Sequence, residues 1–199
     1  EMSYRRVHSH GTWLAFPDGW WPLQGVVTMK RVMVLIISVV VLACVTGCAV
    51  RHARRELSDR EATQAVLEAN KALVLRAHED VWSSGNLDVV DELYSLDYVA
   101  HWAHGNDSDR EGLKKMVAEA RAACPDLRED VIHVVAEGNL VVTHFISSGT
   151  FTGEMDGLEP SGQELSRPEI AVHRIAEGMI AEQWTVADQL TLMRQLGLM

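Results

Sequence analysis

Two long segments with a hydrophobic period of two constrain this chain most strongly. The segments "DVIHVVAEGNLVVTHFISSGTF" (130–151) and "RPEIAVHRIAEGMIAEQWTV" (167–186) alternate apolar and polar residues, as strands with one buried face do. Each contains one turn dipeptide, Gly138-Asn139 in the first and Glu177-Gly178 in the second. The sequence therefore predicts two antiparallel hairpins joined by a Gly- and Pro-rich loop.

Helical patterns precede the hairpins. Ser58 and Glu61 form a capping box before a helical stripe that reaches about Trp82, and a third helix is expected over 108–124. A short second helix is expected at 87–95, a short strand or turn at 96–105, and a last short helix at 190–196. Helices followed by a curled antiparallel sheet indicate an α+β domain.

The front of the chain has the layout of an export signal. Met29 is followed by two basic residues, an uncharged apolar run and "VTGC", which ends at Cys48. This resembles a bacterial lipoprotein signal, with Cys48 as the lipidated residue. The alternative is an uncleaved span over 32–50. Both predict an exported domain held at a membrane. We interpret residues 1–28 as a start-site artefact, 29–48 as the signal peptide, 49–57 as a charged linker and 58–199 as the domain.

Charge and cysteine content exclude several classes of function. The whole chain carries a formal charge of −10, and from Cys48 onward 14 basic and 26 acidic residues give −12. A domain this acidic is unsuited to bind nucleic acid. Cys124 is the only cysteine of the domain, so an internal disulfide is impossible. His101 and His104 have a spacing that some metal sites use, but no third ligand is near, so no metal or cofactor is expected.

The second hairpin predicts an unusual interior. A two-residue turn at Glu177-Gly178 pairs Ile175 with Ile180, and one face then carries His173, Glu182 and Trp184, with Asp188 in the same parity. The opposite, wet face would carry Arg174, Gln183 and Thr185. Because burial raises a carboxylate pKa, these inward acids suit general acid/base chemistry. The structural alternatives are a His173–Glu182 ion pair and an Asp188 cap on the last helix.

The C-terminal two thirds resembles the SnoaL-like polyketide cyclases, or ester cyclases, of the nuclear-transport-factor-2-like superfamily. The resemblance covers roughly residues 68–199 and is carried by "ACPDLRED", "HRIAEGMIAEQWTVADQLTLMRQLG" and, more weakly, "LDYVAHWAHG". Its most specific part is Glu182-x-Trp184-x-x-x-Asp188. The resemblance implies a cone-shaped sheet around a deep pocket, closed by three helices, and a cofactor-free intramolecular aldol condensation.

The same resemblance implies roles for single residues. Asp188 would be the general acid/base, with His173 and His101 in the pocket and Trp184 as a wall. His144 stands where the family pattern has an arginine, so it would bind an oxyanion only when protonated or as a neutral donor. Glu182 and Tyr98 complete the expected substrate-binding set; the alternative for Tyr98 is packing at the mouth.

Several alternatives stay open at this level. The substrate is expected to be a small apolar carbonyl compound; the rival is a non-catalytic lipoprotein that binds a ligand or protein partner. Relatives in the superfamily also hydrolyse epoxides with two acids bridged by an arginine, and no inward arginine is evident here. Pairing through the open face of the sheet would give a homodimer.

Overall fold

The structure is a computed structural model that describes residues 23–102, 105, 107–155 and 157–199. The chain divides into two compact units, Glu1–Asp59 and Arg60–Met199, which are described separately. Most of the supposed start-site artefact, residues 1–22, lies outside the described residues, as does His104.

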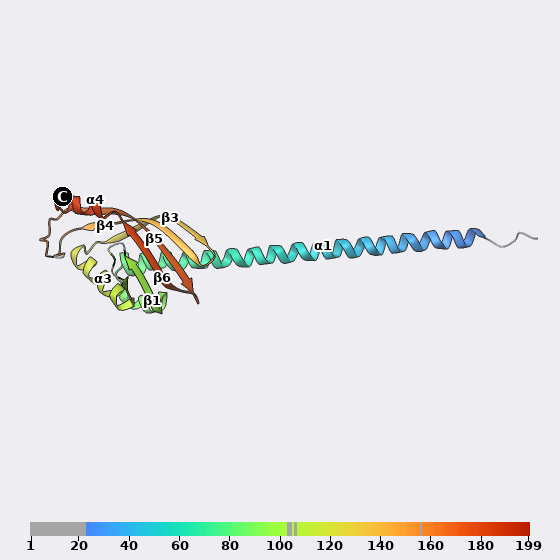
Figure 1. The fold of residues 1–199 in the computed structure, drawn as a ribbon, viewed down its shortest axis with the longest axis horizontal. Coiled ribbons are helices and arrows are strands. Elements are labelled where there is room, and N and C mark those ends of the chain that lie inside the picture. Colours follow the sequence, from blue (N-terminus) through green and yellow to red (C-terminus); the bar gives the residue numbers. More distant parts are fainter. Residues whose placement is uncertain (1–22, 103–104, 106, 156) are drawn as a thin grey trace, which may run out of the picture. The chain divides into compact units, whose positions relative to one another are not determined.

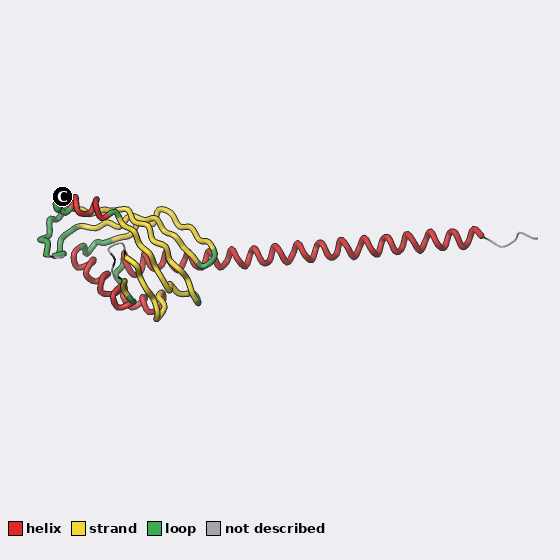
Figure 2. The backbone as a smooth tube through the Cα atoms, viewed as in Figure 1, coloured by secondary structure: helices red, strands yellow, loops and turns green. Residues whose placement is uncertain are grey.

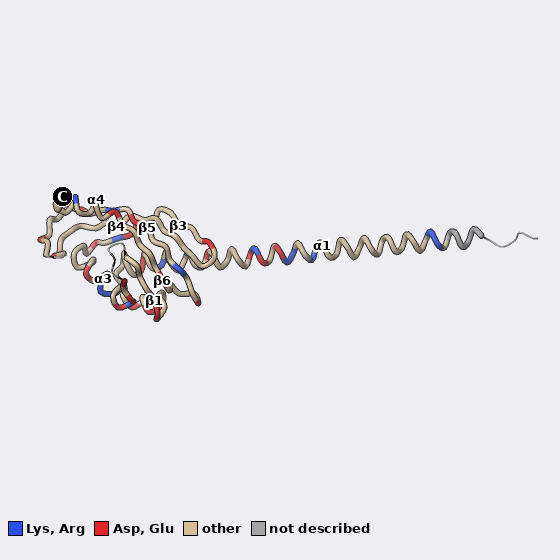
Figure 3. The backbone as a smooth tube through the Cα atoms, in the orientation of Figure 1, with Lys and Arg blue, Asp and Glu red and all other residues tan. Residues whose placement is uncertain are grey.

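The first unit contains most of one long helix, α1 (Leu23–Arg76). An 18-residue window near its start has a mean hydropathy of 2.8 and is not buried, and no charged residue occurs between Arg31 and Arg51 (Figure 3). Ser38 and Thr46 donate their hydroxyls to backbone carbonyls one turn earlier, each at 2.9 Å, so the apolar stretch has no unsatisfied hydroxyl. The helix is long and apolar enough to cross a membrane, but a signal sequence has the same properties, so the lipoprotein signal stays a prediction.

The helix predicted to begin at Ser58 begins earlier in the structure. Residues 49–57, expected as a linker, are helical, and no helix begins at Ser58 because α1 continues through it. Arg51 to Glu56 contains good helix formers and no glycine or proline, so nothing in this charged segment ends the helix.

The second unit is built on one six-stranded sheet, in the order β2-β1-β6-β5-β4-β3 (Figures 1 and 2). Its strands are β1 (Tyr94–Trp102), β2 (Asp107–Ser108), β3 (Arg128–Glu137), β4 (Leu140–Thr150), β5 (Glu164–Ala176) and β6 (Met179–Ala187). Both hairpins are confirmed, but β1 pairs with β6 in parallel. The expected all-antiparallel sheet is therefore wrong: the sheet is mixed. β1 and β6 lie far apart in the sequence, so the local sequence did not fix their relative direction.

Helical segments cover one face of the sheet. A π-helical segment (Ala77–Ser83) extends α1; a 3₁₀ turn (Leu87–Val89) leads into α2 (Val90–Leu93); and α3 (Arg110–Ala123) follows β2. Asp109 caps α3 by accepting a hydrogen bond from the Gly112 N–H at 2.8 Å, as the sequence predicts. The largest fully buried side chains of this layer come from helices and strands together: Val74, Val81, Leu93, Tyr94, Tyr98, Leu113, Val117 and Ile180. The predicted α+β class is confirmed.

A bulge in the second hairpin decides which residues reach the interior. Glu177 and Gly178 adopt φ values of 52° and 77°, as a tight hairpin turn requires, and Ile175 pairs with Ile180. One extra β6 residue, Ala181, then shifts the register, so that Arg174 faces Glu182. Because side chains alternate, the shift turns the rest of β6 over.

Candidate functional site

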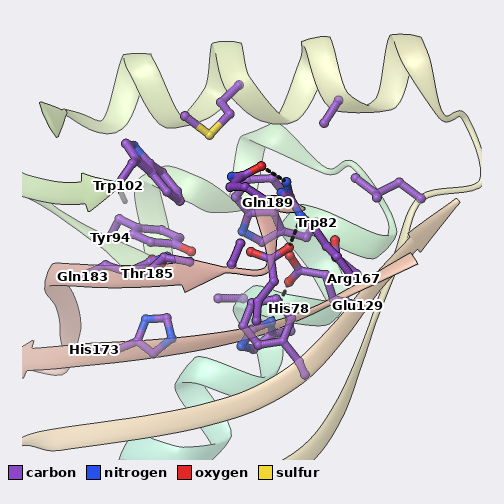
Figure 4. A pocket seen from close by; sticks show the side chains of 18 residues that line it. His78, Trp82, Tyr94, Trp102, Glu129, Arg167, His173, Gln183, Thr185 and Gln189 are labelled. Atoms are coloured by element: carbon purple, nitrogen blue, oxygen red, sulfur yellow. Dashed lines mark hydrogen bonds and ion pairs between the residues drawn. The ribbon is translucent and has the colours of Figure 1, made fainter. Parts of the chain in front are cut away.

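A cavity of about 150 Å³ lies between the helical layer and the sheet (Figure 4). Aromatic side chains form part of its wall, and several polar side chains share the lining, which is the usual make-up of a ligand site. The aromatic residues are Trp82, Tyr94, Trp102 and Phe145, and the polar ones include His78, Glu129, Arg167, Glu169, His173, Gln183, Thr185 and Gln189.

Four buried polar side chains form a chain beside the cavity. Glu129 Oε2 lies 2.5 Å from His78 Nδ1, and His78 Nε2 lies 3.1 Å from Thr143 Oγ1. Thr143 Oγ1 lies 3.5 Å from His173 Nε2. Burial raises the pKa of Glu129, although the neighbouring His78 opposes the shift. The sequence analysis did not identify Glu129, His78 or Thr143, although Thr143 has the inward parity of Val141 and Phe145 on β4.

His173 lies in the interior, as the sequence predicts. It is 3% exposed, and burial, aided by His78, lowers its pKa to about 3. The imidazole is therefore neutral at physiological pH. Its Nδ1 is buried and has no hydrogen-bond partner among the described residues. A buried nitrogen without a partner is costly, so a ligand or water that completes this hydrogen bond is favoured.

An inward arginine joins the polar lining, contrary to the sequence analysis. Arg167 Nε lies 2.9 Å from Glu169 Oε1, and an Arg167 terminal nitrogen donates to Gln189 Oε1 at 3.1 Å (Figure 4). Arg167, Glu169 and His173 have the same parity on β5. Extending the alternation from His173 back to the start of β5 would have predicted that Arg167 and Glu169 point inward.

The bulge at Ala181 exchanges the predicted faces of β6. Gln183 and Thr185, expected on a wet face, are buried and line the cavity. Gln183 accepts a hydrogen bond from the Tyr98 hydroxyl at 3.1 Å and donates to Thr185 at 2.8 Å. Tyr98 is buried in the core rather than part of the cavity lining.

Glu182 and Trp184, expected inside, lie on the outer face of the sheet instead. Glu182 binds Arg174 at 2.8 Å and His101 Nε2 at 3.0 Å. His101 also contacts Asp107 and stacks on Trp184, with ring centroids 5.4 Å apart. Trp184 is 38% exposed. The ion pair considered for His173 and Glu182 does not form, and His101 is not a cavity residue.

Comparison with known proteins places this geometry in a family. The model of the SnoaL-like polyketide cyclases matches residues 72–196, which is more than half of the chain. The chain belongs to this family. A curated relative, the nogalonic acid methyl ester cyclase of Streptomyces nogalater, is 25% identical over 119 residues, covering 58% of this chain and 89% of the relative.

Solved structures of similar proteins support this family membership. IdmH of Streptomyces antibioticus, described as a putative polyketide cyclase, is 30% identical with a TM-score of 0.58, covering 64% of this chain and 98% of its own. AclR of Streptomyces galilaeus, described as a putative hydroxylase, is 26% identical with a TM-score of 0.62, covering 67% and 83%.

In this SnoaL-like domain, Asp188 has the geometry of a helix cap. It precedes α4 (Gln189–Gln195) and accepts hydrogen bonds from the Thr191 hydroxyl at 2.7 Å and the Thr191 N–H at 2.9 Å. These bonds, the hydroxyl first, lower the pKa of Asp188. The carboxylate is exposed and does not line the cavity. The expected inward acid with a raised pKa is therefore not found at Asp188, and its catalytic role stays a prediction.

His144 also lies outside the cavity. It is on the outer face of β4, where its ring stacks on His133 with Nδ1 atoms 3.1 Å apart. His144 and Asp188 border one shallow hollow there, together with Ile170 and Val186. The sequence analysis placed His144 at the substrate because it matched a family position, but the parity of β4 directs it outward.

No metal site is evident in the part of the chain that the structure describes. No three His, Cys, Asp or Glu side chains of those residues are grouped so as to hold an ion. Burial raises the pKa of the Cys124 thiol, which makes it a weak nucleophile. Among the described residues, the cavity lining contains two acids, two histidines and one arginine.

Proposed function

We propose that this SnoaL-like domain catalyses a cofactor-free proton transfer, of the aldol-cyclase or isomerase type, on a small carbonyl compound bound in the cavity. His173 would be the residue that contacts the reacting atoms. The observation that carries the proposal is a neutral, buried imidazole with an unpartnered Nδ1 in a cavity that also contains two carboxylates and an arginine.

The cavity has the groups that enolate chemistry needs. A base removes a proton from a carbon next to a carbonyl, and hydrogen-bond donors stabilise the negative oxygen that results. Neutral His173 can accept a proton at Nδ1 or donate one there, depending on its tautomer. Arg167 contributes a positive charge to the cavity wall, and the aromatic residues bind the apolar part of the substrate.

The relatives suggest the substrate class. The curated relative is named for the cyclisation of a methyl ester; we extend this to a methyl or related ester of a polyketide-type acid. A cavity of about 150 Å³ accommodates one ring, since a cavity of that size holds benzene. The remainder of a larger substrate would occupy the mouth.

The test is hydrogen–deuterium exchange at activated carbons, followed by NMR, with β-keto esters and fused-ring ketones. The full chain in detergent micelles would be compared with His173→Gln and Asp188→Asn. We expect exchange by the wild type, a loss of about 100-fold or more in His173→Gln, and near-normal exchange in Asp188→Asn. Loss in Asp188→Asn alone would transfer the role to Asp188.

A second candidate function is ligand binding without catalysis. It is favoured by Asp188, since the acid that the family uses for catalysis is occupied as a cap here. Ligands that bind the wild type with no exchange, and lose affinity in His173→Gln, would support this function.

We further propose that the chain is an exported bacterial lipoprotein attached at Cys48. The long uncharged stretch before Cys48 and its exposed surface support this proposal. Cells fed an alkynyl fatty acid should label the wild type at Cys48 but not Cys48→Ala. Labelling of neither protein would leave the uncleaved membrane span as the alternative, and equal labelling of both would place the lipid at another residue.

A homodimer through the outer face of the sheet is proposed as well. Three apolar residues of this face, Val135, Ile170 and Val186, are 51–67% exposed, and a second copy packed on this face would bury them. Native mass spectrometry in detergent should show a dimer that Ile170→Glu dissociates; a wild-type monomer would refute this pairing.

A further inference from the structure

Glu129, His78, Thr143 and His173 come from four different elements and meet in one line of polar atoms. They lie on β3, the π-helical segment, β4 and β5 respectively. All four are buried: the Glu129 and His78 side chains are 6% exposed, Thr143 is fully buried and His173 is 3% exposed. Burying four polar groups is expensive unless they satisfy one another, and here the contacts along the line offset that cost.

The hydrogen bonding along the line has two complete arrangements. In the first, Glu129 is ionised and accepts from His78 Nδ1–H, His78 Nε2 accepts from the Thr143 hydroxyl, and Thr143 accepts from His173 Nε2–H. His173 Nδ1 then presents a lone pair. In the second, Glu129 is protonated, every bond is reversed and His173 carries its proton on Nδ1. Each contact satisfies both arrangements, because a hydroxyl and a neutral imidazole can each donate and accept.

We propose that these four side chains form a proton relay, in which a proton taken from the substrate at His173 Nδ1 is stored on the Glu129 carboxylate. The relay rests on the proposed function of the cavity. Glu129, His78 and Thr143 are positioning and proton-storing residues behind His173.

Every proton and the electron pair are accounted for in this transfer. The substrate carbon loses a proton to His173 Nδ1 and keeps the electron pair as an enolate. His173 Nε2–H passes to Thr143, the Thr143 hydroxyl proton passes to His78 Nε2, and His78 Nδ1–H passes to Glu129. The reverse sequence returns the proton to the product oxygen or carbon.

The relay explains how His173 can act as a base despite its environment. Burial disfavours an imidazolium at this position, so a proton that remained on His173 would be unstable there. Passing a proton on at the other nitrogen leaves His173 neutral throughout. The same burial favours the neutral form of Glu129, so the carboxylate is suited to hold the proton.

Other charged groups near these four side chains shift the pKa of Glu129. Glu169 on β5 raises the pKa of Glu129, and Arg167 on the same strand lowers it. Tyr94 of β1 and Gln183 and Thr185 of β6 also line the cavity near His173 (Figure 4); Gln183 and Thr185 do not titrate, and the pKa of buried Tyr94 is raised further from neutrality. A pH titration of Glu129 therefore reports on the relay, with the charges of Glu169 and Arg167 acting on Glu129 in opposite directions.

The decisive variant is Thr143→Val, which keeps the shape of the side chain and removes the hydroxyl. Thr143→Ser is the matched control because it keeps the hydroxyl. The measurement is ¹⁵N NMR of the histidine side chains in the full chain in micelles. In the wild type and in Thr143→Ser, His173 should exchange its Nε2–H tautomer for its Nδ1–H tautomer as the pH falls, in step with protonation of Glu129 and without becoming an imidazolium.

In Thr143→Val, His173 should keep one tautomer at every pH of the titration. Glu129→Gln should fix the tautomer as well, which retains the test if the valine variant does not fold. A wild-type tautomer that does not change with pH, or one that changes equally in Thr143→Val, overturns the relay.

The exchange assay gives a second, separate readout. Thr143→Val should exchange substrate carbons at least about tenfold more slowly than the wild type, with unchanged ligand affinity, whereas Thr143→Ser should stay within about threefold. Exchange in Thr143→Val at the wild-type rate refutes the relay and leaves His173 acting alone. If the wild type itself exchanges nothing, the proposed function fails, and the tautomer coupling still decides whether the four groups act together.

Discussion

Protonation of His173 should make the domain less stable in acid by an amount that can be worked out from its burial. The ordinary pKa of 6.5 applies to the unfolded chain, and burial lowers the folded value to about 3. Between these values the unfolded chain binds a proton that the folded chain does not. The stability that a neutral His173 supplies is thus complete above pH 6.5 and is lost as the pH falls toward 3.

The magnitude follows from about 1.36 kcal/mol for each unit of pKa difference. Lowering the pH from about 7.5 to about 5 should cost the wild type about 2 kcal/mol through this one group. His173→Gln cannot titrate, so its loss over the same range should be smaller by that amount. Glu129 acts with the opposite sign, because its raised pKa makes the folded state bind a proton more readily, and comparing the two proteins cancels its effect as long as Glu129 titrates alike in both.

The assay is hydrogen exchange of the most protected β4 and β5 amides, corrected for intrinsic rates, in the full chain in micelles. His144→Gln is the matched control, since His144 lies on the outer face; it should retain the wild-type pH dependence. Equal losses in the wild type and His173→Gln would refute the assignment of a neutral, desolvated imidazole.

Three further predictions concern residues outside the cavity. Asp188→Ala should destabilise the domain by about 1 kcal/mol through loss of the α4 cap, measured by calorimetry, and Asp188→Ser should recover most of it. Deletion of Ala181 should remove the bulge and keep Glu182 opposite Arg174 and Gln183 inward, because the residue pairs on either side of the bulge then follow one another without a break; the near-ultraviolet circular dichroism should stay close to that of the wild type, and its loss would contradict this register. Glu182→Gln should lower the pKa of His101, followed by NMR titration, because the hydrogen bond that His101 donates to Glu182 is the main cause that raises it; stability should change by less than about 1 kcal/mol.

Local signals were sufficient for the elements and turns. Asp109 at the start of α3 and Gly178 in the second hairpin act through short-range geometry, so their roles could be predicted from neighbouring residues. The fold class followed from the order of helical and alternating segments. The extent of α1 could not, because a capping box at Ser58 also fits inside a continuing helix.

The site was harder to predict because its composition depends on one inserted residue. The turn residues were correct and Ile175 was paired correctly, but the alternation was carried through Ala181 without a break. That step exchanged the predicted directions of Glu182 and Gln183, so that residues of the cavity wall were expected on a wet surface. The bulge has no glycine to mark it, and both Ile180 and Ala181 are buried, so the sequence offers no local sign of it.

The inward orientation of His173 was predicted correctly because the face of β5 does not depend on the bulge. Its partners could not be predicted in the same way. His78 lies in a helical segment, and Glu129 lies on β3, 51 residues after His78 in the sequence. Only the folded sheet brings these two residues together. Arg167 was within reach, since it is three alternations from His173 on the same strand.

The central claim is that the substrate binds in the cavity with its carbonyl group at His173. A crystal structure of the protein with a non-reactive β-keto ester analogue tests this most directly. We predict that the acidic carbon of the analogue, between its two carbonyl groups, lies within about 3.5 Å of His173 Nδ1, with the apolar part of the analogue against Trp82 and Trp102. An analogue bound instead in the outer hollow beside His144 and Asp188, with His173 unliganded, would contradict the account.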